Sequence, residues 1–220
     1  MFEGHINQDF RVLSRYLRSY VAGKKCLDVG CGHGLFSRLM IELGASDVTG
    51  VDFDPHEIQM AQSLTLPRSR FLVGDAACLP VGDESMDFCL STEVLTHLPP
   101  EKRLRALREI FRVLAPGGKA IVTFHNQNRI ALSRALSRSS AGKTANLWPT
   151  TRDEMCRDLS LMGFRVISKA YLNYFNRLSV RMQSEHPGYA RFLSLLEDAA
   201  SRIPLAKSFS IVFMVVVEKP

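Results

Sequence analysis

The sequence has no long hydrophobic run, no internal repeat and no paired-cysteine motif. Its longest uninterrupted apolar segment, Ile211 to Val217, is far shorter than the roughly 20 residues that a membrane-spanning helix requires. The five cysteines are odd in number and form no C-x-x-C pair, which favours free thiols in a reduced compartment over a disulfide framework. The N-terminal MFEGHINQDF lacks the basic start and apolar run of a secretory signal. We therefore expect a soluble, cytoplasmic protein, with peripheral membrane association left open.

Metal-ligand spacings are absent as well. The histidines, cysteines and aspartates form no grouping with the spacing of a zinc or other transition-metal site, so no metal cofactor is expected. The 220 residues, 46% hydrophobic and 23% charged, have the composition of one soluble globular domain covering residues 1–220. The net charge is +6, and the basic excess is concentrated between Pro99 and Lys143. This distribution suggests an anionic partner without identifying it.

Short β-branched runs alternate with helical periodicity from Lys24 to about Phe124. This alternation is typical of βαβ units around a parallel sheet with helices on both faces. An amphipathic helix precedes it, because apolar residues recur every three or four positions between Ile6 and Leu17. The predicted strands are residues 25–30, 47–52, 70–75, 86–91, 119–124, 164–170 and 208–218. The other predicted helices are 35–43, the segment after Pro55, the segment after Pro99-Pro100, a segment from Thr151, and about 189–200.

A glycine-rich turn, Asp28-Val29-Gly30-Cys31-Gly32-His33-Gly34, follows the first predicted strand and opens a helix. Glycines at this junction allow the backbone to approach a ligand closely. The turn departs from the dinucleotide fingerprint G-x-G-x-x-G, since its third glycine comes one residue early. Asp52 and Asp75 end the next two strands. The carboxyl ends of parallel strands meet at one sheet edge, where open α/β sheets bind ligands.

In this combination the sequence resembles the class I S-adenosylmethionine-dependent methyltransferases, in their small-molecule group. The matching motifs are LDVGCGHG, VTGVDFDP, GDAACLP, STEVLTHL and REIFRVLAPGG, between Cys26 and Gly118. Met162-Gly163-Phe164 resembles the group's later "aGF" motif. The resemblance implies a Rossmann-like, seven-stranded, mostly parallel sheet with an antiparallel seventh strand. It also implies S-adenosylmethionine as cofactor and S-adenosylhomocysteine as product.

The resemblance assigns cofactor roles to ten residues. The glycine turn would lie along the methionine part, Asp52 would hold the ribose hydroxyls, and Phe53 would pack on the adenine or ribose. Asp75 and Ala76 would read the adenine edge, and Ser91 and Thr92 would contact the cofactor near its sulfonium. The assigned residues are Asp28, Gly30, Cys31, Gly32, Asp52, Phe53, Asp75, Ala76, Ser91 and Thr92.

Three residues near the ends of the fourth and fifth strands are candidates for a general base. Glu93 and His97 follow the fourth strand four residues apart, and His125 follows the fifth strand. A general base adds about 10²–10⁴-fold when the acceptor carries a proton. The alternative for each is packing or hydrogen bonding alone. The fourth strand does not continue into Asn/Asp-Pro-Pro-Tyr/Phe, which disfavours methylation of adenine, cytosine or glutamine amino groups by that motif.

Segments outside the motifs would determine the substrate. We expect an N-terminal helical cap (1–23), a cofactor-binding half (24–124) and two substrate-side insertions (125–149 and 171–207). The candidate substrate contacts are Arg129, Arg134, Tyr171 and Tyr174. The preferred function is methyl transfer to an oxygen, nitrogen or carbon of a small metabolite, with an anionic or amphiphilic acceptor as one option. The alternatives are an RNA or protein methyltransferase and a non-catalytic interaction subunit; nucleic acid is not the expected partner, and the oligomeric state is open.

The basic residues of the helix after Pro100 have a simpler interpretation. Lys102, Arg103, Arg105, Arg108 and Arg112 are expected to form a solvated face. The opposite, buried face would hold Leu104, Leu107, Ile110 and Phe111. Of the basic residues between Pro99 and Lys143, only those in the 125–149 insertion are then left as candidate substrate contacts.

Overall fold

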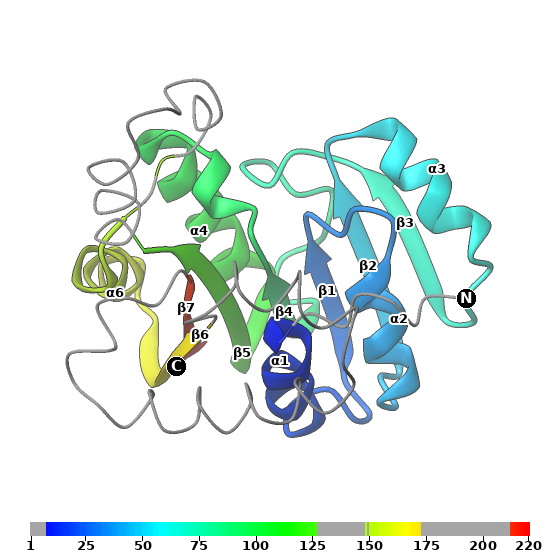
Figure 1. Cartoon of the computed structure of the whole chain (residues 1–220), viewed down its shortest axis with the longest axis horizontal. Helices are drawn as coiled ribbons and strands as arrows, with labels where there is room; N and C mark the ends of the chain where they lie inside the picture. The colour runs from blue at the N-terminus through cyan, green and yellow to red at the C-terminus, as the bar shows by residue number, and fades with distance from the viewer. Residues whose placement is uncertain (1–7, 127–147, 149, 173–211) are drawn as a thin grey trace, which may run out of the picture.

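The computed structural model describes residues 8–126, 148, 150–172 and 212–220. These residues contain a seven-stranded sheet with the order β3-β2-β1-β4-β5-β7-β6 (Figure 1). The predicted fold class is confirmed. The strands are β1 (Lys25–Val29), β2 (Asp47–Asp52), β3 (Ser69–Val73), β4 (Met86–Ser91), β5 (Leu114–His125), β6 (Arg165–Leu172) and β7 (Val212–Glu218).

Strands β1 to β5 are parallel to one another, whereas β7 runs antiparallel to both β5 and β6. Six of the seven residues of β7 are buried, which matches its continuous apolar sequence VFMVVV. The strand order reverses between β1 and β4, because the chain builds outward from β1 to β3 and then returns to the other side. Such a reversal leaves a crevice outside the carboxyl ends of the strands.

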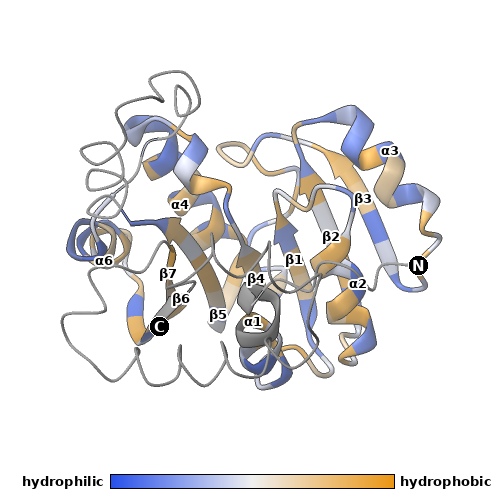
Figure 2. Ribbon diagram, in the orientation of Figure 1, coloured by the Kyte–Doolittle hydropathy of each residue, from blue (hydrophilic) through white to orange (hydrophobic). Residues whose placement is uncertain are grey.

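Helices cover both faces of the sheet (Figure 1). They are α1 (Gln8–Arg18), α2 (Leu35–Glu42), α3 (Pro55–Ser63), the 3-10 helix η1 (Leu95–His97), α4 (Pro100–Val113) and α6 (Arg152–Leu161). One core cluster packs α1 and α2 against the sheet, and another packs α4 and α6 against its other face. The described part of the predicted N-terminal cap thus contributes Leu13 and Leu17 to the core. Figure 2 shows the apolar residues concentrated on the strands.

The predicted starts of α3 and α6 and the predicted end of α2 are confirmed to within about one residue. The Asp54 carboxylate caps α3 by accepting a hydrogen bond from the His56 backbone N–H at 2.9 Å. Thr151 and Glu154 form both hydrogen bonds of a capping box on α6. Gly44 has a φ of 90° just after the end of α2, a backbone conformation that favours glycine. None of the described helices is long and apolar enough to cross a membrane.

The connection between α4 and β5 differs from the prediction. The sequence predicts that Pro116-Gly117-Gly118 ends the helix before a strand at 119–124, but α4 already ends at Val113 and β5 begins at Leu114. Gly117 and Gly118 are held in the strand by the C-terminal segment. The Gly117 N–H donates to the Lys219 carbonyl at 2.8 Å, and the Lys219 N–H donates to the Gly118 carbonyl at 2.9 Å. The partner segment is distant in sequence, so local turn propensity could not reveal it.

The prediction of a uniformly solvated basic face on α4 is wrong. Arg103 is only 7% exposed and shares the buried face with Ala106 and Ile110, whereas Leu104 is only partly buried. Its guanidinium donates a hydrogen bond to the Trp148 backbone carbonyl at 3.1 Å. Burial lowers the pKa of Arg103, against the opposing effect of two acids of α6. Arg105 and Arg108 are exposed as expected.

Candidate functional site

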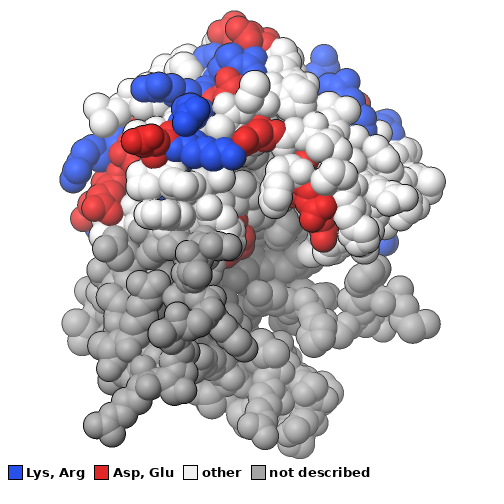
Figure 3. Space-filling view, turned by 90° about the horizontal axis from the view of Figure 1, so that it is seen from above, with Lys and Arg blue, Asp and Glu red and all other residues white. Residues whose placement is uncertain are grey.

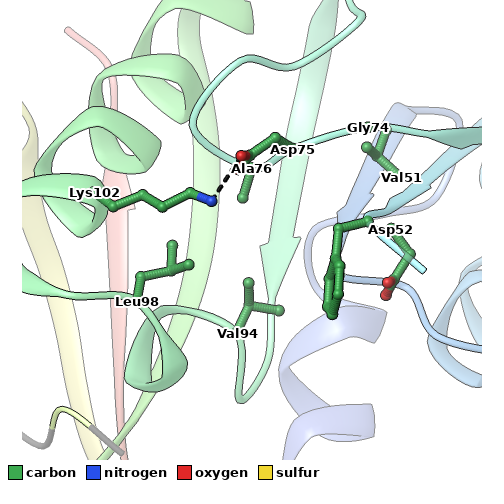
Figure 4. A pocket seen from close by; sticks show the side chains of 10 residues that line it. Val51, Asp52, Gly74, Asp75, Ala76, Val94, Leu98 and Lys102 are labelled. Carbon is green, nitrogen blue, oxygen red and sulfur yellow. Dashed lines mark ion pairs between the residues drawn. The ribbon is translucent and has the colours of Figure 1, made fainter. Parts of the chain in front are cut away.

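A pocket lies at the strand-order reversal, outside the carboxyl ends of the strands (Figure 4). One wall comes from the loops that follow β1, β2 and β3. The other comes from the segment after β4 and the first turn of α4. The lining residues are Gly30, Val51, Asp52, Phe53, Gly74, Asp75, Ala76, Val94, Leu98 and Lys102. The site predicted from the three strand ends is therefore a hollow to which all three loops contribute.

Gly30 brings the loop after β1 against the segment after β4. Its φ of 71° is in the left-handed region, and a Cβ built on it would lie 1.9 Å from Val94 Cγ2. No side chain fits there unless Val94 moves. The Gly30 N–H donates to the Val51 carbonyl at 2.7 Å, which ties the loop to the end of β2. The glycine thus allows a close approach of backbone to the pocket wall.

The Asp52 carboxylate supports the glycine loop from the end of β2. Its Oδ2 accepts from the Gly32 N–H at 2.9 Å, and its Oδ1 accepts from the Asp54 N–H at 3.0 Å. Asp52 is 9% exposed. An ionised carboxylate has about four acceptor positions, so these two bonds leave capacity for hydroxyl donors of a ligand. The neighbouring Phe53 ring is 80% exposed on the pocket, a placement that suits a stacking surface.

Asp75 lies opposite a lysine, just after the end of β3. Its Oδ1 accepts from the Ala77 N–H at 2.9 Å, and its Oδ2 pairs with Lys102 Nζ at 2.7 Å. Partial desolvation raises the Asp75 pKa, but the bonds from Lys102 and Ala77 outweigh it and hold the pKa below its usual value. The carboxyl group is therefore an ionised acceptor at neutral pH.

Asp28 differs from the other two acids because it is 1% exposed, beneath the glycine loop. The Ser37 hydroxyl donates to its Oδ2 at 2.6 Å, and within the described residues its Oδ1 has no hydrogen-bond partner. Burial raises the Asp28 pKa to about 6, against the opposing effect of Ser37. The three predicted acids therefore occupy two environments, with Asp52 and Asp75 lining the pocket and Asp28 behind it.

The other predicted cofactor residues vary in exposure. The Cys31 side chain packs with Ile58, Ala61 and Phe71, and burial raises the pKa of its thiol. Ser91 is fully buried, and its Oγ has no partner among the described residues. The next residue, Thr92, is partly exposed. The side chains of Cys31 and Ser91 are thus not at the pocket surface, which leaves their backbones for any contact.

Two of the three candidate bases form an ion pair. Glu93 and His125 are 32 positions apart, and the Glu93 carboxylate contacts His125 Nε2. Glu93 has a φ of 63°, and its backbone N–H donates to Thr123 Oγ1 at 3.0 Å. Such backbone strain is retained where surrounding contacts hold it, often at functional sites. His97 ends η1 with an exposed side chain and takes no part in this pair.

Trp148 is bonded to η1 and α4 by contacts that the sequence did not predict. Its backbone N–H donates to the Thr96 carbonyl at 2.7 Å, and its carbonyl accepts from Arg103. Thr96 Oγ1 also accepts from the His125 N–H at 3.2 Å. The Trp148 side chain is 46% exposed. No local pattern encodes these contacts, since they join segments that are 29 to 52 positions apart in the sequence.

Most of the predicted substrate contacts lie outside the described residues. Arg129, Arg134 and Tyr174 are in segments that the structure does not describe, as are most of the two insertions and the predicted helix 189–200. Tyr171 is described through its backbone alone, which pairs with Phe213 in the sheet. These four contacts stay predictions. Among the described residues there is no group of three or more His, Cys, Asp or Glu that could hold a metal ion.

Part of the chain is similar to known methyltransferases. Residues 27–122 match the family model described as "Methyltransferase domain". An "Uncharacterized methyltransferase" of Mycobacteroides abscessus is 38% identical over 106 residues, covering 46% of this chain and 40% of the relative. The 2-methyl-6-phytyl-1,4-hydroquinone methyltransferase of a Synechocystis strain is 38% identical over 107 residues, covering 48% of this chain and 33% of the relative. Each match spans less than half of the relative's length.

The described architecture has solved counterparts. The crystal structure of an S-adenosylmethionine-dependent methyltransferase from Mesorhizobium loti aligns with a TM-score of 0.69 and 18% identity, covering 97% of this chain and 98% of that one. At this identity the likeness shows the fold. Fold and pocket together define a Rossmann-like α/β domain. Residues 27–122 of the chain are therefore similar to this methyltransferase family, and the fold agrees with that similarity.

Proposed function

We propose that the protein transfers a methyl group from S-adenosylmethionine to an oxygen, nitrogen or carbon of a small metabolite in the cytoplasm. The observation that carries this proposal is the pocket, where Asp52, Phe53 and Asp75 stand at the ends of two adjacent strands. The methyltransferase domain and the fold support the reaction class. The proposed substrate class rests on Glu93, His125 and Trp148.

The residues present fit this cofactor. Asp52 offers carboxylate oxygens to ribose hydroxyls, Asp75 offers an acceptor to the adenine amino group, and the exposed Phe53 ring offers a face for stacking. Asp52 and Asp75 at the pocket suit a ligand that carries positive charge, and the buried Asp28, whose Oδ1 has no partner among the described residues, adds an acid behind them. When bound, S-adenosylmethionine supplies a methyl group on a positively charged sulfur. The glycine loop itself contains no lysine, which disfavours a phosphate in its place.

The main catalytic contribution of the chain is then positioning. A pocket that holds both reactants in a reactive orientation can supply roughly 7–11 kcal/mol of the barrier. The glycine loop is fixed to β2 by the Gly30 and Asp52 hydrogen bonds, so it is organised before a ligand arrives. No metal is needed for this role.

We assign proton removal from the acceptor to the Glu93–His125 pair. An imidazole that takes a proton gains positive charge, and the contacting Glu93 carboxylate stabilises that charge. The Thr96 and Thr123 hydroxyls accept from the backbone N–H groups of His125 and Glu93, which fixes both residues at the sheet edge. The pair suits an acceptor that carries a proton at neutral pH, such as a phenol or an amine.

The acceptor that we propose first is a phenol or hydroquinone of anionic or amphiphilic character. One relative is named for a hydroquinone substrate. The Trp148 backbone is bonded to Thr96 of η1, and its half-exposed side chain offers an aromatic surface. Arg129, Arg134, Tyr171 and Tyr174 would contribute further contacts. On the face shown in Figure 3, the Lys and Arg of the described residues are interspersed with Asp and Glu, which gives the RNA alternative no support.

The test is methyl transfer from labelled S-adenosylmethionine to a panel of hydroquinones, phenols and amines, with products identified by mass. Transfer to a panel member, abolished in the double variant Glu93→Gln/His125→Asn, supports the proposal. Cofactor binding without transfer to the panel or to a metabolite extract would favour the interaction-subunit alternative. Salt-dependent RNA binding with transfer to RNA would favour the nucleic-acid alternative.

A further inference from the structure

We propose that Lys102 determines specificity for adenine, donating to a ring nitrogen of the base while Asp75 accepts from its amino group. The inference rests on the proposed function, since it requires the cofactor's adenine in this pocket. It adds a residue that none of the sequence motifs suggested.

Lys102 reaches the pocket from the wall opposite Asp75. It is the third residue of α4, four positions after Leu98, and both side chains line the pocket. Figure 4 shows the Lys102 side chain extended across toward Asp75, with Nζ 2.7 Å from Oδ2. A charged donor and a charged acceptor from two separate elements thus lie side by side on the pocket surface.

This ion pair contributes little to the stability of the fold. The Lys102 and Asp75 side chains are 39% and 45% exposed. Pairs with such exposure contribute about 0–1 kcal/mol, because water screens them and both side chains lose freedom. Asp75 is also fixed by the Ala77 N–H, so it does not need Lys102 to hold its orientation. A ligand that uses both charges is a stronger reason for the arrangement.

Adenine has the complementary pattern. Its amino group is a donor, and ring nitrogens N1 and N7 beside it are acceptors. A carboxylate facing the amino group and an ammonium facing an adjacent ring nitrogen would satisfy both. A lysine ammonium has three donors, so Nζ can keep its bond to Asp75 while it donates to the base. A base with a carbonyl oxygen in place of the amino group would instead face the Asp75 carboxylate with an acceptor.

The neighbouring residues are compatible with a flat base at this position. Phe53 and Leu98 add apolar surface to the same pocket. Arg105 is the other cation whose charge acts on Asp75, but it is exposed and does not line the pocket. Arg105 therefore provides a matched control, with the same charge on the same helix and no contact with the pocket.

The experiment is calorimetric titration of the full chain with S-adenosylhomocysteine. Lys102→Met is expected to weaken binding about tenfold, the loss of one charge-assisted hydrogen bond. Lys102→Arg keeps a charged donor and should lie between Lys102→Met and wild type. Arg105→Met should stay within about twofold of wild type. Thermal unfolding of each variant verifies that the fold is intact.

Two analogues identify the bond itself. S-adenosylhomocysteine with carbon in place of N1, and the corresponding N7 analogue, each remove one acceptor. One of them should bind wild type about tenfold more weakly than the parent, and this difference should vanish in Lys102→Met. Equal binding of parent and both analogues by wild type would overturn the proposal.

Unchanged or tighter binding of S-adenosylhomocysteine by Lys102→Met would also overturn it, because Lys102 would then be a counter-ion that competes for Asp75. In both of these results the wild type still binds the parent ligand, so the proposed function stands. If wild type does not bind S-adenosylhomocysteine at all, the proposed function fails and the role of Lys102 fails with it.

Discussion

The two halves of the sheet's carboxyl edge are held together in different ways. The part that we propose for the cofactor, called the cofactor half below, consists of the loops after β1, β2 and β3 within residues 28–76. It is fixed by glycine turns and backbone hydrogen bonds between neighbouring strands. The part that we propose for the acceptor, called the acceptor half below, comes from separate segments and consists of Glu93, Thr96, Arg103, His125 and Trp148. It is fixed by side-chain bonds across long sequence separations.

This difference separates two tasks. Close packing and tight turns give the cofactor half one shape. Individual polar contacts hold the acceptor half, and each can be exchanged without dismantling the sheet. Variants in one half should therefore leave the function of the other intact, and single substitutions can test that independence.

The largest effect is expected at His125. His125→Asn removes the proposed base and should lower the rate of methyl transfer by about 10²–10⁴-fold at neutral pH. The affinity for S-adenosylhomocysteine should stay unchanged, because His125 is in the acceptor half. Steady-state kinetics and calorimetry check the two expectations, with the exposed His56→Asn as control. A loss of cofactor affinity in His125→Asn would contradict the independence of the two halves.

A loss of roughly 100-fold in S-adenosylhomocysteine affinity, about 2.7 kcal/mol, is expected for Gly30→Ala. The new Cβ would lie 1.9 Å from Val94 Cγ2, so the loop after β1 must move. Gly117→Ala is the matched control, because Gly117 has a similar φ of 76° and a Cβ added there would meet nothing within 4 Å. Both variants carry the strain of a positive φ, and only Gly30→Ala should lose the ligand. Equal affinities would contradict the packing argument.

Asp28 should make the stability depend on pH. Its folded-state pKa of about 6 is above the unfolded value of 3.8, so the folded protein favours the protonated acid. The stabilisation is complete below about pH 4 and is lost as pH rises through 6. Asp28→Asn should remove this dependence, changing the difference in unfolding free energy between variant and wild type by on the order of 2–3 kcal/mol from pH 4 to 7. Denaturant unfolding measures it, and a pH-independent difference would refute the assignment.

Arg103 should have the smallest effect, on stability. Arg103→Met removes the donor to the Trp148 carbonyl and should lower the unfolding free energy by about 1–2 kcal/mol. It should also weaken acceptor binding while leaving the affinity for S-adenosylhomocysteine unchanged. Arg108→Met removes the same charge from an exposed position of α4 and should change stability by less than about 0.5 kcal/mol. Equal effects of the two variants would mean that the buried contact contributes nothing.

The cofactor half could be predicted from the sequence because the residues that form it follow local patterns. The glycine turn, Asp52 and Asp75 each follow a short apolar strand, and parallel topology brings strand ends together. Helix caps at Asp54 and Thr151 were equally local. The arrangement of the acceptor half could not be predicted in this way. Glu93 and His125 were separate candidates, and their pairing depends on the alignment of β4 with β5.

Arg103 shows why such contacts escape sequence reasoning. Its position on α4 fits the buried face, but its charge argued for solvent. The carbonyl that it meets, at Trp148, is 45 positions away. The role of Lys102 was not predicted for the same reason, since its partner Asp75 belongs to another element. Where a polar residue is stabilised by a distant partner, local periodicity cannot identify the partner.

The most direct test of the cofactor pocket is calorimetric titration of wild type, Asp52→Ala and Asp52→Asn with S-adenosylhomocysteine. Wild type should bind, and Asp52→Ala should bind about 10- to 100-fold more weakly, since bonds to a charged acceptor are worth about 1.5–3 kcal/mol each. Asp52→Asn should lie between them. Asp47→Ala, at the opposite end of the same strand, should match wild type. An Asp52→Ala affinity equal to that of wild type would contradict the assignment of this pocket to the cofactor.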